Sequence, residues 1–487
     1  MEVTKRCSFF VVLVVAMFFV FSNFGSVNAA PVSFETAQVV AENWMERVGE
    51  DRVVDEGRTL QNEGNSIGYL FSFSGGGFVV VPMDDTFEPV KAWSRRGHFR
   101  GDPSRSMDME TMVKKSFLRQ KHFLVTVRAS SANYQSSLTD AHEGWRRILS
   151  PGEVRAQESS QVVGPLLTTT WGQREPYNAY CPIDNDNGEL SVTGCTSTAM
   201  AQILRYWRWP EAGTGSKCYS YCSNYDCLNN PEVTLCADFE HVYNWNKMPD
   251  ILTESSPAEE IDTVATLMSD LGIIFETNYS SSGSGAFPYE DDFSTYLGYS
   301  DEVEIVYESW SSSYSTIKNQ LDKGYPVFFC SSNHAYVADG FREDLGMNQT
   351  HFNFGWDGSS DGWYTIEGLN EFWGASYDSS SRVTMIINIY PDFITADSAP
   401  DSPVLEVVVN GTIVNCSWQP VTGATGYLFS YAPAPYTGPG SIVTVDWGSQ
   451  TSMSANLWVG ASYFVAIQAY NLIGGSEYSN IGLFEIR

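Results

Sequence analysis

The sequence predicts an α+β protein that ends in a β-sandwich, and its segment order and linkers carry this prediction. Within residues 163–395, segments with helical spacing come first, and strand-like segments follow after residue 300. This order is typical of α+β folds rather than of doubly wound α/β folds. A smaller α+β region precedes them at 30–162. Linkers rich in Pro, Ser, Asp or Gly, at 150–165 and 391–403, separate these regions from each other and from 396–487.

Residues 1–29 have the composition of a signal peptide. Lys5 and Arg6 precede the apolar run CSFFVVLVVAMFFVF, and Val27-Asn28-Ala29 offers small residues for cleavage. The run is shorter than the ~20 residues of a membrane-spanning helix, which argues against a membrane anchor. We therefore expect a secreted, extracellular protein with no membrane span after the signal is removed.

Charge is distributed unevenly along the chain, whose formal net charge is −30. Residues 163–487 hold 10 Lys and Arg against 39 Asp and Glu, whereas 30–162 hold 16 against 18. An acidic surface repels phosphates, so the composition argues against a nucleic-acid partner. The change near residue 162 predicts that two functionally distinct pieces meet there.

The elements of 30–162 follow from apolar spacing. A helix is expected in 31–49, because Ala37, Val40, Ala41 and Trp44 recur at helical intervals. The segment IGYLFSFSGGGFVVVPMDD predicts two strands joined at Gly75-Gly76-Gly77, and residues 109–129 predict a longer basic helix.

In 163–395, helices are expected from about Gly194 and in AEEIDTVATLMSDLGI, residues 258–273. The strands expected after them are YPVFFC, AYVADGF, HFNFGW, GWYTI and VTMIINIY. Residues 396–487 carry alternating strands with Trp418 on an early one, and they resemble a fibronectin type III module.

Nine cysteines are present, and Cys7 leaves with the signal peptide. Cys218, Cys222, Cys227 and Cys236 cluster with the spacing C-x3-C-x4-C-x8-C. Two local disulfides are favoured in an exported chain, with three pairings open. The alternative is a structural zinc site, although the usual C-x2-C pairs are absent. We expect no catalytic metal and no cofactor.

Cys195 fits neither a strand nor this cluster, because it opens an amphipathic helix directly after Gly194. Unpaired N–H groups and the helix dipole favour a thiolate there, and a thiolate attacks carbonyls. Such a nucleophile needs a base. His334 begins a strand just beyond an apolar strand, where a site can form, and Asn353 follows nineteen residues later, where it could accept a hydrogen bond from the imidazole.

Four segments together resemble the streptopain family of cysteine peptidases, within the papain superfamily. They are WGQREPYNAYCP, TGCTSTAMAQILRYWRWP, HAYVADGF and FNFGWDGSSDGWYTI, in the family's order. The segment GGGFVVVPMDDTFEPVKAWSRRGHF is similar to part of the family's propeptide. The resemblance implies a papain-like domain of two lobes, one helical and one antiparallel, over 163–395. It also implies an inhibitory propeptide at 30–162.

The resemblance also implies site roles. Cys195 would be the nucleophile, and His334 the general base and acid. Gln173 would donate to the oxyanion, with the Cys195 backbone N–H as second donor, because developing negative charge needs preorganised donors. Asn353 would orient His334, and Trp356 would shield that hydrogen bond from water.

Ser284 and Asn333 would bind substrate, and 368–382 fits a mobile loop beside the cleft. The family has glycine at the position of Asn333, so this residue narrows the space for substrate backbone. Phe354 replaces a family tryptophan, and Asp357 adds a charge near the site.

The sequence-based hypothesis is therefore a secreted cysteine endopeptidase made as a zymogen. Its partners would be protein or peptide substrates and its own propeptide, and the sandwich would bind an extracellular protein or glycan. One alternative is an adhesion protein with a catalytically inactive peptidase scaffold. Another is an amidase or acyltransferase that uses the same nucleophile.

Overall fold

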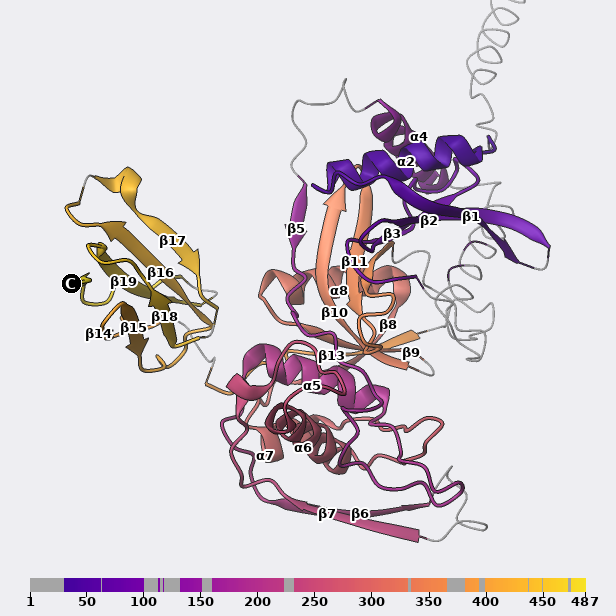
Figure 1. The fold of residues 1–487 in the computed structure, drawn as a ribbon. Helices are drawn as coiled ribbons and strands as arrows, with labels where there is room; N and C mark the ends of the chain where they lie inside the picture. The colour runs from indigo at the N-terminus through magenta and orange to yellow at the C-terminus, as the bar shows by residue number, and fades with distance from the viewer. Residues whose placement is uncertain are drawn as a thin grey trace, which may run out of the picture.

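The computed structural model describes residues 30–62, 64–99, 113, 117, 132–150, 160–222, 232–331, 334–365, 382–393, 399–436, 438–448, 450–471 and 474–487. Its helices and strands form an α+β assembly followed by a β-sandwich, which confirms the predicted fold class (Figure 1). The expected signal peptide lies outside the described residues. None of the described helices has the length and apolar character needed to cross a membrane.

The N-terminal part consists of α2 (Phe34–Arg47), β1 (Val54–Asn62), β2 (Asn65–Phe73), β3 (Phe78–Pro82), β4 (Ala92–Ser94) and α4 (Ala132–Leu149). Helix α2 lies within the predicted range 31–49, and Ser33 caps its start, because the Ser33 hydroxyl accepts a hydrogen bond from the Thr36 N–H at 3.1 Å. Gly75, Gly76 and Gly77 all have positive φ and make the predicted turn. Of the basic helix expected at 109–129, only Val113 and Phe117 are described; both are helical and buried.

The central part supplies most of the remaining α+β elements. It consists of β5 (Gln161–Val163), α5 (Cys195–Trp207), β6 (Ser216–Cys222), β7 (Glu232–Asp238), the 3-10 turn Trp245–Lys247, α6 (Ala258–Ile274), α7 (Glu290–Leu297), β8 (Glu304–Ser309), α8 (Trp310–Asp322), β9 (Val327–Ser331), β10 (His334–Asp344), β11 (Met347–Asn353), β12 (Gly362–Thr365) and β13 (Arg382–Ile387). Strand β5 spans the boundary expected at residue 162 and pairs with β10.

One antiparallel sheet runs through both parts. In the described residues its order is β1-β2-β3-β4-β12-β11-β10-β9-β13-β8, with β5 paired to β10. The N-terminal strands join the central ones where β4 pairs with β12. Therefore the N-terminal part extends the sheet of the central part by main-chain hydrogen bonds.

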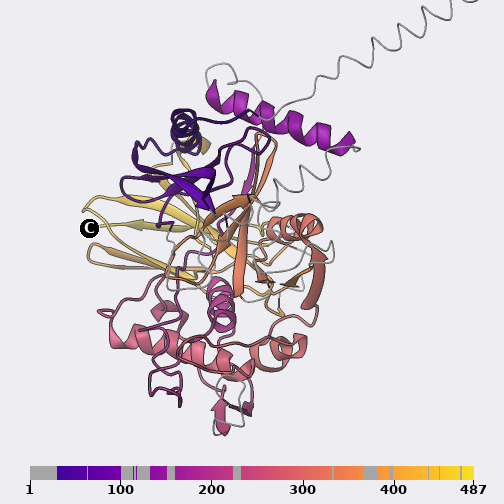
Figure 2. The ribbon, with the colours of Figure 1, turned by 90° about the vertical axis from the view of Figure 1, so that its right-hand side faces the viewer.

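Two apolar cores give the central part its two lobes. One core packs α5 and α6 with residues of β9 and β10, and the other lies on the opposite side of the same strands. Figure 1 shows α5, α6 and α7 gathered below the sheet, and Figure 2 shows them from the side. This matches the two-lobed arrangement that the resemblance implies.

A charged contact reinforces the junction between the N-terminal and central parts. Arg47 of α2 donates two hydrogen bonds to Asp344 at the end of β10, at 2.6 and 2.9 Å. Arg342 donates to the same carboxylate at 2.6 Å. Burial raises the pKa of Asp344, but the two arginines lower it by more than burial raises it. The pKa of Asp344 therefore lies below its ordinary value. Asp344 is therefore held as a carboxylate.

The C-terminal part is the predicted sandwich. Its strands are β14 (Leu405–Asn410), β15 (Ile413–Trp418), β16 (Gly426–Pro433), β17 (Val443–Asp446), β18 (Ser452–Asn456), β19 (Ser462–Tyr470) and β20 (Gly482–Glu485), with a 3-10 turn at Pro439–Ser441. The sheets β14-β15-β18 and β17-β16-β19-β20 enclose one core, in which Trp418 is buried.

The cysteine cluster is built into the hairpin β6–β7. Cys218 and Cys236 are paired residues of its two strands and form a disulfide. Cys222 is also disulfide-bonded, and Cys227 lies outside the described residues. The alternative of a zinc site made by all four cysteines is therefore wrong, because bonded sulfurs cannot act as thiolate ligands.

Candidate active site

Cys195 is the first residue of α5, as sequence predicts. Gly194 caps the helix with a φ of 85°, and a Cβ at this position would lie 2.8 Å from the Ser284 carbonyl oxygen. Only glycine fits both the backbone conformation and the space. The turn before the helix is fixed by Thr193, whose hydroxyl lies 2.8 Å from that of Thr198 one turn into α5.

The environment of the Cys195 thiol differs from the sequence-based expectation. Burial raises the pKa of Cys195, and the backbone N–H groups of Ala335, Thr196 and Cys195 oppose this effect without overcoming it. The N–H groups at the helix N-terminus therefore favour a thiolate, as the sequence predicts, but burial, which the sequence did not predict, outweighs them. An ionised sulfur at this position needs a cation beside it, which an imidazolium can supply.

His334 begins β10 and immediately precedes Ala335, whose N–H reaches the Cys195 sulfur. Its ring stacks on Trp356, with centroids 4.5 Å apart, and its Nε2 lies 2.9 Å from the Phe354 carbonyl oxygen. A carbonyl only accepts, so Nε2 carries the hydrogen and donates. Nδ1 is then the nitrogen that can exchange a proton.

Asn353 makes different hydrogen bonds from those expected. Its Oδ1 accepts from Gln202 Nε2 at 2.9 Å and from the Gly355 N–H at 3.1 Å. Its Nδ2 donates to the Thr169 carbonyl at 2.7 Å and to Gln202 at 3.1 Å. Its polar atoms thus fix the turn at 353–355 against α5. The expected acceptor for His334 is replaced by the backbone carbonyl of Phe354.

Gln173 lies near the same turn. Its Nε2 donates to the Gly355 backbone carbonyl at 3.4 Å, and the backbone carbonyl of Gln173 accepts from the Thr193 N–H at 3.1 Å. The second contact ties Gln173 to the segment that leads into α5. This brings the expected oxyanion donor, Gln173, to the same region as Cys195.

The two predicted substrate-binding residues differ in how far the structure describes them. Ser284 is buried, and its hydroxyl donates to the Val192 carbonyl at 2.7 Å. Its own carbonyl approaches Gly194, so the loop around Ser284 lies beside the start of α5. Asn333 and residues 368–381 of the expected mobile loop lie outside the described residues.

Sequence reasoning missed three groups at this site. Gln202 holds Asn353, and Phe354 supplies the acceptor for His334 through its backbone. Asp361 accepts from the Phe354 N–H at 2.8 Å. Gln202 and Asp361 both belong to the quoted motifs, TGCTSTAMAQ and DGWYT, which were the available signal. A backbone carbonyl leaves no such signal.

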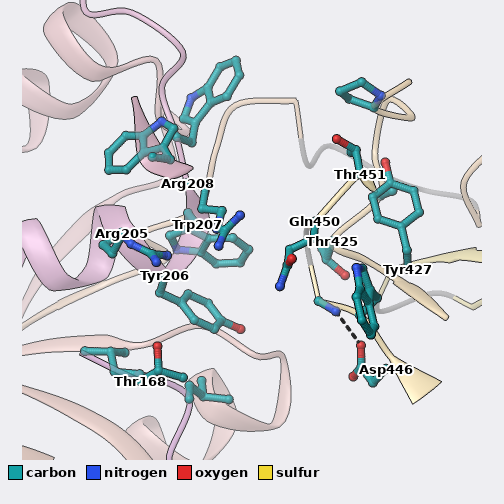
Figure 3. A pocket seen from close by; sticks show the side chains of 18 of the residues that line it. Thr168, Arg205, Tyr206, Trp207, Arg208, Thr425, Tyr427, Asp446, Gln450 and Thr451 are labelled. Carbon is teal, nitrogen blue, oxygen red and sulfur yellow. Dashed lines mark hydrogen bonds between the residues drawn. The ribbon is translucent and has the colours of Figure 1, made fainter. Parts of the chain in front are cut away.

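A cavity of about 980 Å³ lies at the other end of α5, between the central part and the sandwich (Figure 3). Its walls include Arg205 and Arg208 on one side and Tyr427 and Asp446 on the other. Because α5 rises ~18 Å from its first to its last residue, this cavity is separate from the region around Cys195.

Comparisons with known proteins identify the family of the chain. The sequence model of the peptidase C10 family matches residues 171–364 of this chain. The chain is 28% identical over 309 residues to the thiol protease/hemagglutinin PrtT of Porphyromonas gingivalis, covering 60% of this chain and 33% of PrtT. It is 27% identical over 325 residues to streptopain of Streptococcus pyogenes, covering 62% of this chain and 74% of streptopain. The chain thus spans about a third of PrtT and about three quarters of streptopain.

Two solved structures are also similar to this chain. A prointerpain A fragment of Prevotella intermedia is 27% identical with a TM-score of 0.51, and the match covers 69% of this chain and 98% of the fragment. Active interpain A from the same organism is 30% identical with a TM-score of 0.39, and the match covers 47% of this chain and 95% of that protein. The match of the family model and the similarity to streptopain and to the prointerpain A fragment show that the chain belongs to the peptidase C10 family.

Proposed function

We propose that this chain is a secreted cysteine endopeptidase made as a zymogen, which hydrolyses peptide bonds of proteins through a thioester intermediate. The observation that carries the proposal is the placement of Cys195 against Ala335, the residue that follows His334. A helix-terminal thiol and an imidazole with a fixed tautomer are the two parts that nucleophilic acyl transfer requires.

In the proposed reaction, His334 Nδ1 takes the thiol proton of Cys195, and the resulting imidazolium stabilises the thiolate. The sulfur attacks the carbonyl carbon of the scissile peptide bond. The carbonyl oxygen becomes an oxyanion, to which Gln173 Nε2 and the Cys195 backbone N–H donate. Preorganised donors of this kind typically contribute ~10²–10³ in kcat each.

The tetrahedral intermediate then collapses as the C–N bond breaks. His334 gives its proton to the leaving amine, and the acyl group stays on the sulfur as a thioester. Water, deprotonated by His334, attacks the thioester and restores the thiol. Stacking of Trp356 on the imidazole keeps solvent from the Nε2–Phe354 hydrogen bond during these steps.

We propose that 30–162 is the inhibitory propeptide. Its support is the shared sheet, in which β4 pairs with β12, and the approach of Gly97 to Gly358, where a Cβ would lie 2.8 Å from the Gly358 carbonyl oxygen. The segment around Gly97 therefore lies against the loop that follows Trp356. The similarity to the prointerpain A fragment extends over 69% of this chain. Cleavage within 150–164 would release 163–395 as the peptidase domain together with the sandwich at 396–487.

The substrates would be proteins or peptides, with Ser284 and Asn333 on the substrate-binding loops. The sandwich would serve as an extracellular binding module for a protein or glycan. Residues 1–29 would direct export.

The test compares the purified full chain with Cys195→Ala and His334→Ala. We expect the wild type, under reducing conditions, to cleave itself between residues 150 and 164 and then to hydrolyse casein. N-terminal sequencing and intact mass locate the cut. Both variants should remain full length and leave casein intact.

His241→Gln is the matched control, because His241 is a partly exposed histidine on a different segment, where it pairs with Asp270. It should mature and hydrolyse casein like the wild type. Casein hydrolysis by folded Cys195→Ala would refute the assigned nucleophile. Absence of hydrolysis by a wild-type chain that has lost 30–162 would favour the binding-protein alternative.

A further inference from the structure

The peptide group of Phe354 connects His334 to Asp361. On one side the Phe354 carbonyl accepts from His334 Nε2 at 2.9 Å. On the other side the Phe354 N–H donates to Asp361 Oδ1 at 2.8 Å. Neighbouring hydrogen bonds polarise one another, so a negative charge on Asp361 strengthens the attraction of this segment for a positively charged imidazole.

We propose that Asp361 is a positioning residue for His334, and that its carboxylate fixes the Phe354 peptide and stabilises the imidazolium through it. This inference rests on the proposed function, because it assigns His334 the role of catalytic base. Asp361 would contact neither substrate nor the Cys195 sulfur. It acts on the reaction only through the Phe354 backbone.

The surroundings of Asp361 explain why it responds to pH. Burial, and the carboxylates Asp339 and Asp357, raise the pKa of Asp361 to about 7, while the Phe354 N–H and His351 oppose the rise. Tyr364 on β12 also interacts with Asp361, and its pKa is raised. Asp361 therefore changes charge near neutral pH, within the range in which an imidazole titrates.

His351 links Asp361 to the sheet beneath. Its Nδ1 lies 2.6 Å from Asp339 Oδ1. Burial alone would lower the pKa of His351, but the charge of Asp339 raises it overall. A cationic His351 faces two carboxylates, Asp339 and Asp361, so its positive charge favours the ionised form of Asp361.

The charge of Asp361 sets the direction of the pH effect on His334. Because the pKa of Asp361 is raised in the folded chain, the carboxylate forms as pH rises through about 7. Above that pH, Asp361 favours the imidazolium of His334 and hence the thiolate of Cys195. Below it, the protonated group keeps an oxygen for the Phe354 N–H but loses the charge. Removing the charge by mutation should therefore make thiolate formation at Cys195 harder.

Two substitutions separate the two parts of the proposal. Asp361→Asn keeps an oxygen that accepts from Phe354 N–H and removes the charge. Asp361→Ala removes both. Asp291→Asn is the control, since it neutralises an exposed carboxylate on α7 that is not among the charges acting on Asp361.

The first readout is the pH profile of Cys195 alkylation by iodoacetamide after an added protease has cut each variant within 150–164, followed by peptide mass. It does not depend on peptide hydrolysis. In Asp361→Asn we expect the midpoint to move up by at least ~0.5 pH unit, because the charge that favours the imidazolium is gone. The Asp291→Asn midpoint should stay where the wild-type midpoint lies.

The second readout is turnover of a peptide substrate. Displacing a catalytic group by about 1 Å costs roughly a hundredfold, so kcat should fall ~100-fold in Asp361→Ala with KM nearly unchanged. Asp361→Asn should lose about tenfold, which corresponds to ~1.4 kcal/mol. An unchanged alkylation midpoint and an unchanged kcat in folded Asp361→Asn would overturn the proposal. If Asp361→Ala does not fold, Asp361→Asn alone tests the proposal. A wild type with the expected alkylation profile but no hydrolysis would refute the proposed function and leave the role of Asp361 intact.

Discussion

Trp93 stacks on Trp363, with ring centroids 5.9 Å apart and planes 9° from parallel. The two residues are register partners of β4 and β12, the strands that join the N-terminal part to the central sheet. Trp93 Nε1 also donates to Gln349 Oε1 at 3.0 Å. Main-chain, aromatic and polar contacts therefore coincide at one point of the junction, close to the loop that carries Trp356.

Trp93→Ala should loosen this junction. Replacing a buried tryptophan by alanine costs ~3–5 kcal/mol, shared here between docking and the core around Trp44. In precursors kept intact by His334→Ala, we expect Trp93→Ala to increase the rate of Cys195 alkylation at least tenfold. Trp458→Ala, which alters a tryptophan 63% exposed on the sandwich, should leave the rate unchanged. If Trp93→Ala and Trp458→Ala precursors are alkylated at Cys195 at the same rate, the junction does not cover the thiol.

Arg47→Ala should weaken the same junction through charge. Arg47 is one-third exposed and Asp344 is buried, so loss of the pair should cost about 1–2 kcal/mol. The amide protection of residues 362–365 against hydrogen exchange, measured in the Cys195→Ala precursor, should fall ~5- to 30-fold. Arg146→Ala removes an exposed pair with Glu143 and should have no effect there.

The pH dependence of that protection follows from Asp344. Its pKa is lowered in the folded chain, so its contribution is complete above the ordinary carboxyl pKa of ~3.9 and is lost only as pH falls below it. Protection that depends on Arg47 should be equal at pH 7 and pH 5, and should decrease at pH 3. A decrease between pH 7 and pH 5 would contradict the assignment of the docking charge to Asp344.

Gly194→Ala should impair activity more than stability. Its φ of 85° and a Cβ contact of 2.8 Å with the Ser284 carbonyl oxygen force either the loop or the start of α5 to move. A shift of about 1 Å at Cys195 predicts a loss of ~100-fold in kcat. Gly188→Ala is the control, because Gly188 has a φ of 74° but no atom within 4 Å of the added Cβ. Melting temperatures and kcat of both variants separate backbone strain from displacement of the thiol.

Sequence patterns predict the parts of the fold that depend on interactions between residues close in the chain. The start of α5 at Cys195 follows from Gly194 and the apolar spacing after it, and the turn at Gly75-Gly76-Gly77 follows from three residues that tolerate positive φ. The motif around His334 placed it at the start of a strand, which is where the structure has it. In each case the determining groups lie within a few residues of each other.

Contacts between distant segments account for what sequence reasoning got wrong or missed. Asn353 pairs with Gln202, 151 residues away, so its polar atoms are engaged by α5. The acceptor for His334 is a backbone carbonyl, which any residue at 354 provides. The raised pKa of Cys195 depends on burial beneath several segments, and periodicity within one segment does not report burial.

Cys330 provides a last prediction about thiol selectivity. It is the register partner of Ala335, the residue whose N–H reaches the Cys195 sulfur. Burial, followed by the charge on Cys195, raises the pKa of Cys330 to about 12. At pH 7 only roughly one Cys330 in 10⁵ is then a thiolate, the reactive form.

In the processed protein at pH 7, iodoacetamide should therefore label Cys195 at least ~100-fold faster than Cys330, because only Cys195 has an imidazolium to stabilise its thiolate. Peptide mass spectrometry measures both rates in one sample. In urea, where burial is lost, the two cysteines should react at similar rates. Comparable labelling of both in the folded protein would mean that His334 does not ionise Cys195. His334→Ala, cut within 150–164 by an added protease, should lose the preference, since it lacks the cation and keeps both thiols partly buried.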